Sequence, residues 1–207
     1  MSSIDIVEKI YSWRKSEKEK HKREPDTYYV TDLVRCPLKR EYELMYPELS
    51  AYELMYPPYV VGDLLHMGLQ RILQEIFGEK ILIEVESEKK VALPDGSIVK
   101  IRGRSDGIIT LDNNRKIGVE IKSSKSDYGL PMDHHIDQAK IYNWLFDLEE
   151  TILIYVTYDR VAQYIIRDKV SEDEIISRIK YSTAPRYPWE CSYCAYSVIC
   201  PFKKTQK

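Results

Sequence analysis

Apolar residues recur along this chain at two spacings, and the spacing predicts which segments form helices and which form strands. An apolar residue at every third or fourth position is the repeat of an amphipathic helix, and it occurs in residues 3–23, 60–78, 133–150 and 171–183. Short runs rich in β-branched residues and bounded by turn residues predict strands at 81–93, 97–102, 105–111, 116–122, 151–157 and 161–168. The order of these elements predicts an α/β fold in which helices flank a mixed β-sheet.

Residues with positional preferences mark several of the predicted boundaries. The run from Pro94 to Gly96 predicts a turn between the first two strands. Thr31 is a plausible helix N-cap, and Pro37 suits the first turn of a following helix. Ser171 and Glu174 have the spacing of a capping box, so they predict the start of the last helix.

Two segments also carry predictions about burial. Helix 60–78 has an apolar stripe made by Val61, Leu65, Gly68, Ile72 and Ile76. His66 lies beside this stripe, on the edge shared with Gly62, Leu69 and Leu73. A single helix histidine is more often a packed or surface residue than a metal ligand. Strand 151–157 is almost continuously apolar, which predicts burial on both faces.

The segment from Arg102 to Lys125 reads as two strands joined by a tight turn centred on Asn113. Asp106 and Glu120 lie seven residues either side of that centre, so we expect them to face each other across the hairpin. Directly opposed residues have Cβ atoms about 5 Å apart, and two carboxylates that close repel unless a positive group lies between them. Strand alternation places Lys122 on the same face as Glu120.

Two interpretations of this hairpin are open. It is either a surface hairpin with a cross-strand ion pair involving Arg104 and Lys122, or a site that holds a divalent cation beside a phosphate. In the second case the carboxylates supply oxygen ligands, and the lysine orients a water or neutralises charge on phosphate oxygens. Val119 and Ile121 should point the other way, into a core. The spacing, an Asp followed after thirteen residues by Glu-x-Lys, resembles the catalytic core of the PD-(D/E)XK nuclease superfamily.

Composition limits the class of protein. The chain has 207 residues, of which 43% are hydrophobic and 31% charged, so it is long enough for one globular domain with a core. Its net charge is −2, which excludes a protein that coats nucleic acid non-specifically and requires a local patch for any phosphate contact. We see neither a signal peptide nor an apolar run long enough to span a membrane, and expect a cytoplasmic protein.

Four cysteines have the spacing of a metal site. Cys191, Cys194 and Cys200 form C-x2-C-x5-C-P, and Cys36 is the only cysteine that could be a fourth ligand. Four thiolates hold either a structural zinc ion or an iron–sulfur cluster, and cytosolic cysteines are more often ligands than disulfides. The remaining alternative is a set of unconnected buried cysteines. Either metal would join the two ends of the chain around the hairpin.

The hexapeptide YELMYP occurs twice, at residues 42–47 and 52–57. A ten-residue shift is too short for a solenoid repeat, and the proline in each copy predicts a break in the element. The tyrosines and methionines could line a path for single-stranded bases, although packing is the commoner role of such residues.

Taken in order, these features resemble the CRISPR-associated iron–sulfur exonucleases, a family of four-cysteine RecB-like nucleases. The shared features are one upstream cysteine, a helix histidine, the D…ExK pattern, a helical Q-x-x-x-Y and the C-terminal cysteine motif. They extend from about Thr31 to Phe202, and the local contexts GDLLHMGL, GRSDGII, VEIKSS and WECSYCAYSVICP are similar to those of archaeal members or their relatives in archaeal viruses. The duplicated YELMYP segment is not part of the family pattern.

The resemblance implies a role for each of these residues. Mg²⁺ or Mn²⁺ would be bound by His66, Asp106, Glu120 and the Ile121 carbonyl. Lys122 would position the attacking water, and Gln138 and Tyr142 on the neighbouring helix would support Lys122 or the DNA. A structural [4Fe–4S] cluster would be held by Cys36, Cys191, Cys194 and Cys200.

The resemblance also implies a function. It implies hydrolysis of single-stranded DNA, with 5′→3′ exonuclease action and in some members endonuclease action. We expect one nuclease domain over residues 1–207, with 60–184 as the catalytic core and with 1–59 and 185–207 as a cluster-bearing cap. CRISPR integration proteins, a helicase and further copies of the chain are the protein partners that stay open. The alternative function is a non-catalytic iron–sulfur DNA-binding or adaptor module that retained the fold.

Overall fold

The computed structural model describes residues 4–20, 23–181 and 183–204. Six strands form one mixed sheet in the order β1-β3-β4-β5-β6, with β2 paired to β3 outside this path. Their bounds are β1 Thr27–Tyr29, β2 Ile81–Ala92, β3 Ile98–Thr110, β4 Lys116–Ser123, β5 Glu150–Val156 and β6 Val161–Ile166. The predicted mixed sheet is confirmed, and the predicted segments 97–102 and 105–111 are parts of the single strand β3. The short strand β1 was not predicted.

Six α-helices and four 3₁₀ helices occur among the described residues. The α-helices are α1 Ile6–Lys20, α2 Val30–Leu33, α3 Pro37–Met45, α4 Pro57–Phe77, α5 Asp133–Leu145 and α6 Glu172–Lys180. The 3₁₀ helices are η1 Pro47–Met55, η2 Gly78–Lys80, η3 Pro188–Ser192 and η4 Ala195–Val198. All four predicted helices are present. Residues 3, 21, 22 and 182 of the predicted ranges lie outside the described residues.

Some predicted boundaries are confirmed and others are wrong. Pro37 is the first residue of α3, and Ser171 caps α6 in a capping box with Glu174, as predicted. Thr31 is not an N-cap, because α2 already begins at Val30. The helix predicted over 133–150 ends at 145, since the backbone reverses at Asp147, where φ is 55°, before β5 begins.

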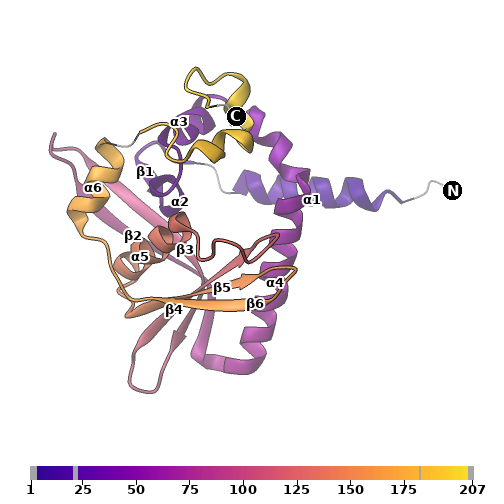
Figure 1. The fold of residues 1–207 in the computed structure, drawn as a ribbon, viewed down its shortest axis with the longest axis vertical. Coiled ribbons are helices and arrows are strands. Elements are labelled where there is room, and N and C mark those ends of the chain that lie inside the picture. The colour runs from indigo at the N-terminus through magenta and orange to yellow at the C-terminus, as the bar shows by residue number, and fades with distance from the viewer. Residues whose placement is uncertain (1–3, 21–22, 182, 205–207) are drawn as a thin grey trace.

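Helices cover both faces of the sheet (Figure 1). On one face, Leu65, Leu69, Leu73 and Phe77 of α4 pack on the sheet residues Ile81, Ile109, Val119 and Ile121. The burial of Val119 and Ile121 confirms the predicted orientation of β4. On the other face, α2, α5 and α6 form the larger core with β2 and β3. The parallel pair β4–β5 is joined through α5, so this helix crosses the sheet directly behind the hairpin.

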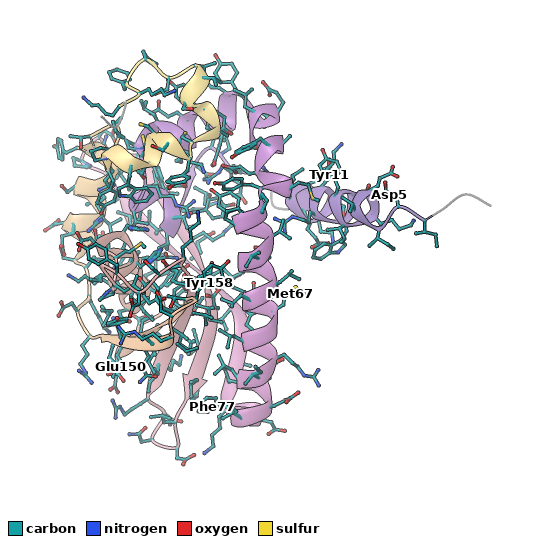
Figure 2. The ribbon with its side chains drawn as sticks, turned by 45° about the vertical axis from the view of Figure 1, so that its right-hand side comes forward. Asp5, Tyr11, Met67, Phe77, Glu150 and Tyr158 are labelled. Carbon is teal, nitrogen blue, oxygen red and sulfur yellow. The ribbon has the colours of Figure 1, made fainter. Side chains whose placement is uncertain are left out.

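The face of α4 that packs on the sheet shares only Leu65 with the predicted stripe. Val61, Ile72 and Ile76 from the predicted stripe are more than half exposed, and the buried side of α4 is the edge that carries His66, Leu69 and Leu73. Figure 2 shows Met67 on the outer side of this helix, pointing away from the sheet. Because α4 is apolar around most of its circumference, periodicity alone does not identify its buried side.

Strand β5 is also less buried than predicted. Thr151, Leu153 and Tyr155 are buried against α5, whereas the alternate positions on the α4 side are only partly buried. The prediction of burial on both faces is therefore wrong, because α4 covers the β4 side of the sheet and leaves the β5 side partly open.

Helix α1 projects from the body of the molecule (Figures 1 and 2) and has no buried residue. Its C-terminal half is held by Arg14, which donates to the Leu54 carbonyl and pairs with Asp63 of α4, and by Lys18, which donates to Ser50. The YELMYP copies take different conformations, the first at the end of α3 and the second in η1. The predicted break at each proline is confirmed, and each proline is also the first residue of the next helix. No helix among the described residues is sufficiently long and apolar to cross a membrane.

Candidate active site

Strand β3 has an unpaired stretch in its middle. Strand β1 pairs with residues 100–102 and β4 pairs with residues 107–110 on the same edge, so residues 103–106 lie in a gap between the two partners. On the opposite edge the ladder with β2 skips Glu84 and Asp106, and Glu84 has a φ of 52°. Asp106 is therefore free of both ladders, and its side chain is available for other contacts.

The hairpin places Asp106 and Glu120 as predicted. Gly107 pairs with Val119, so the register is centred on Asn113, and Asp106 and Glu120 follow as the next opposed positions. The Asp106 carboxylate accepts a hydrogen bond from the Ile121 amide at 2.7 Å. This hydrogen bond holds the Asp106 carboxylate against β4. The carboxylate takes the place of the backbone carbonyl of β3 that would otherwise bind the Ile121 amide and continue the β3–β4 ladder.

Glu120 is buried, with 3% of its surface exposed, and only one of its oxygens has partners. Oε1 accepts hydrogen bonds from Lys122 Nζ at 2.7 Å and from Gln138 Nε2 at 2.8 Å. Oε2 is buried without a hydrogen-bond partner. A buried carboxylate oxygen left without a donor is costly, so this atom suits a bound cation.

The electrostatics of the site also favour a bound cation. Burial, followed by the charge of Asp106, raises the pKa of Glu120 to about 7, although Lys122 opposes the rise. When Glu120 is ionised, its negative charge is repelled by that of Asp106. A divalent cation between the two carboxylates would remove this repulsion. The arrangement therefore fits a hard metal ion with oxygen ligands.

His66 completes one side of this group. Its Nδ1 lies 3.3 Å from the Asp106 carboxylate. Burial alone would lower the pKa of His66, but the hydrogen bond to Asp106 and the negative charges of the site raise it. Within the described ranges, no three His, Cys, Asp or Glu side chains are arranged to hold one metal ion. Metal binding would therefore require the carboxylates to turn from Ile121 and Lys122.

Helix α5 adds the next layer of the site. Lys122 Nζ donates to Gln138 Oε1 at 2.9 Å, and Gln138 Nε2 lies 3.1 Å from the Tyr142 hydroxyl. That hydroxyl donates to the Arg104 carbonyl in the unpaired stretch of β3, at 2.9 Å. Gln138 and Tyr142 are thus joined to the hairpin by a continuous set of hydrogen bonds, and their shared helix face is the one that the four-residue spacing predicts.

Sequence reasoning missed two residues of this neighbourhood. Gln70 is buried on α4 and donates to the Asp106 carbonyl at 3.1 Å and to the Glu84 carboxylate. Gln70 follows His66 by four residues, so the helical spacing could have indicated it. Glu84 also pairs with Arg104 at 2.8 Å. Its position follows from the irregularity in β2, which no local pattern indicates.

The four cysteines line one cavity of about 230 Å³ between α3 and the C-terminal segment. All four are free thiols. Burial raises the pKa of the Cys36 thiol, while hydrogen bonds from the Leu38 and Lys39 amides lower it. The Lys204 amide donates to Cys191 Sγ at 3.4 Å. Amide donors directed at sulfur suit thiolate ligands, so the chemistry of the donors fits a metal or cluster bound by sulfur. In the described residues the thiols line the cavity without being arranged around one ion, so binding would require them to turn inward.

Comparison with known proteins gives one extensive likeness. The chain is 43% identical over 204 residues to the CRISPR-associated exonuclease Cas4 of Saccharolobus solfataricus, an alignment that covers 97% of this chain and 100% of that protein. The crystal structure of SSO0001 matches the fold with a TM-score of 0.91 at 43% identity, over 97% of this chain and 98% of that one.

A more distant structure is the alkaline exonuclease from Laribacter hongkongensis, with a TM-score of 0.47 and 13% identity over 84% of this chain and 87% of that one. No protein-family model matches the sequence. The likeness at 43% identity spans both the hairpin and the cysteine-lined cavity.

Proposed function

Since the chain belongs to the family of the CRISPR-associated exonuclease Cas4 and is an exonuclease acting on DNA, we propose that its substrate is single-stranded DNA. We further propose that it degrades the strand in the 5′→3′ direction, with some internal cleavage, and depends on Mg²⁺ or Mn²⁺. The observation that carries the metal site is the buried, unpartnered Glu120 Oε2 beside Asp106.

In this proposal the ion would be held by His66, Asp106, Glu120 and the Ile121 carbonyl. The carboxylates and the carbonyl are the oxygen ligands that Mg²⁺ and Mn²⁺ prefer, and His66 would add one imidazole nitrogen. When bound, such an ion supplies Lewis acidity toward a water and a phosphate oxygen. The side chains of His66 and Asp106 already lie 3.3 Å apart, which supports a shared ligand set.

Lys122 is the proposed catalytic cation. Its ammonium group is held between Glu120 and Gln138, and only 16% of its side chain is exposed. With Glu120 engaged by such an ion, Lys122 would donate to the attacking water or to a phosphate oxygen, where negative charge develops in the transition state. Gln138 fixes the position of Lys122, and Tyr142 fixes Gln138 by its bond to the Arg104 carbonyl.

The cysteine-lined cavity is the proposed site of a structural [4Fe–4S] cluster bound by Cys36, Cys191, Cys194 and Cys200. We propose one nuclease domain in which residues 60–184 form the catalytic core and residues 1–59 and 185–207 carry the cluster. Strand β1 and helix α2 from the first segment join the sheet and its core, so the two parts share one hydrophobic interior. CRISPR integration proteins or a helicase are the proposed protein partners.

The test is anaerobic digestion of 5′- and 3′-end-labelled DNA, single- and double-stranded, with Mn²⁺, Mg²⁺ or EDTA. We expect metal-dependent loss of single strands, with the label pattern giving the direction of cleavage. Glu120→Gln keeps the volume of the side chain and removes its charge, so it should lower the rate by about a hundredfold or more. Glu79→Gln makes the same change at an exposed position of η2 and should leave the rate unchanged.

Equal cleavage by the wild type and Glu120→Gln would refute the proposed site. If neither protein cleaves and both bind DNA, the chain is an adaptor that retained the fold, and the nuclease proposal fails.

A further inference from the structure

Aromatic side chains from two distant parts of the chain meet beside the candidate active site. His134 is in the first turn of α5, while Tyr187 and Trp189 belong to the C-terminal segment. The His134 and Trp189 ring centroids are 5.0 Å apart, and the Tyr187 and Trp189 rings are stacked at 5.7 Å with an angle of 16°. We call these three residues the aromatic cluster.

The aromatic cluster lies one helical turn from the catalytic side chains. His134 and Gln138 are four residues apart on α5, so they share a face and their backbones are separated along the helix axis by about 6 Å. Gln138 binds both Glu120 and Lys122, while His134 lines the cysteine cavity together with Trp189. His134 therefore connects the cysteine cavity, which it lines with Trp189, to the helix face that carries Gln138.

The cluster has the properties of a stacking surface rather than of an internal core. Trp189 is 38% exposed, although it already contacts two other rings. Burial, together with the charges of Lys122 and Arg35, lowers the pKa of His134 to about 4, so its ring is neutral at physiological pH. Uncharged aromatic rings stack on any nucleobase, because every base has a π-face.

A basic side chain accompanies the cluster. Arg35 lines the same cavity as His134 and Trp189, and its side chain is exposed. Its positive charge is one cause of the lowered pKa of His134. Among the residues that the structure describes, no carboxylate pairs with the Arg35 guanidinium. The group is therefore available to a phosphate, which guanidinium binds through two parallel hydrogen bonds.

We propose that the aromatic cluster is a binding site for one nucleobase of the DNA strand, with Trp189 as the stacking partner and Arg35 as the contact to that nucleotide's phosphate. This inference rests on the proposed function, since it places the base next to the phosphate that is cleaved. Stacking on Trp189 then determines which phosphodiester of the strand lies at the carboxylates. It also makes the site favour single strands, because their bases are free to stack.

The test uses single-stranded oligonucleotides in which one abasic residue is moved, position by position, along the strand. Dissociation constants are measured with EDTA, and kcat and KM with Mn²⁺. For the wild type we expect one position at which the missing base weakens binding and raises KM by about tenfold, with little change in kcat. Trp189→Ala should bind intact DNA about tenfold more weakly and lose this dependence on position. Trp189→Phe should retain the dependence on position.

Two further variants separate stacking from damage to the fold. Trp13→Ala removes another exposed tryptophan, on α1, and should keep the wild-type profile. His134→Ala changes the cluster from α5, an element that carries no cysteine, and should weaken the dependence on position. The visible absorption of each variant reports whether the cysteine site is intact.

A wild-type binding profile that is flat along the strand would overturn the inference, as would an unchanged position-specific profile in Trp189→Ala and His134→Ala. Because binding is measured without metal, these outcomes are independent of whether Glu120 is catalytic.

Discussion

At the residue scale, Glu120 is a buried carboxyl group that lies next to a second carboxylate. It is buried beside Asp106, one of its oxygens has no partner, and its pKa is raised to about 7. The hairpin pattern predicted that these two carboxylates face each other, because strand register and alternation are fixed by a short turn. The part played by Glu84 was not predictable, since it depends on an irregularity in the β2–β3 ladder, whereas the four-residue spacing from His66 could have indicated Gln70.

The raised pKa of Glu120 predicts how the stability of the metal-free protein changes with pH. A folded-state pKa near 7, above the ordinary 4.5, means that the folded protein keeps a proton which the unfolded chain has released. The free energy of unfolding should therefore fall as pH rises from 5 to 8, by up to an amount on the order of 3 kcal/mol. Urea unfolding in EDTA at several pH values measures it.

Glu120→Gln should flatten this pH dependence, whereas Glu79→Gln should preserve it. Added Mn²⁺ should stabilise the wild type more at pH 8 than at pH 5, since the ion binds the ionised carboxylate. A metal-free wild type with the same pH profile as Glu120→Gln would contradict the raised pKa.

At the scale of elements, the site depends on how closely α5 approaches the unpaired stretch of β3. Gly103 lies at this contact, and a Cβ built there would be 2.7 Å from Leu145, 2.8 Å from Val30 and 2.9 Å from Tyr142. All three neighbours belong to the core, so they have little room to move. The absence of a side chain at Gly103 is what allows Tyr142 to reach the Arg104 carbonyl.

Gly103→Ala should therefore destabilise the protein by about 1–3 kcal/mol through overpacking. It should also lower nuclease activity, because α5 carries Gln138. Thermal unfolding and the DNA digestion assay measure the two effects. Gly68→Ala is the matched control, since a Cβ there meets no atom within 4 Å and alanine favours the helix. Equal melting temperatures for the two variants would contradict this packing argument.

The elements differ in how well their sequence predicts them. The capping box of α6 and the two strands of the hairpin carry local signals, and both are confirmed. The buried face of α4 was wrongly predicted because its outer face is also apolar, and only the position of the sheet decides between the faces. Strand β1 has three residues and pairs with a strand about seventy residues later, so its neighbours in the sequence give no indication of it.

At the scale of the whole molecule, two segments that are far apart in the sequence meet in the cysteine-lined cavity. Cys36 lies beside residues of the C-terminal segment, and its amide donates to the Glu190 carboxylate at 2.8 Å. The spacing of the cysteines predicted that they act together, and the structure brings all four to one cavity. The kind of metal does not follow from spacing, because zinc and iron–sulfur clusters use the same thiolates.

The proposed cluster predicts a coloured protein whose colour depends on both ends of the chain. Cys36→Ser and Cys194→Ser should each lose the visible absorption of anaerobically purified protein and lower its melting temperature, because the cluster closes a very long loop. Ser197→Ala changes another residue of the same cavity and should retain both properties. A colourless wild type containing zinc would identify the site as a zinc site.

The placement of these cysteines also orders events during biosynthesis. Cys191, Cys194 and Cys200 all follow the six strands of the sheet in the sequence. Synthesis proceeds from the N-terminal side of a chain. The strands of the sheet and their carboxylates therefore leave the ribosomal tunnel first, and the cavity can be completed only after residues 191–200 have followed them. Whatever occupies that cavity enters it after every strand of the sheet has been synthesised.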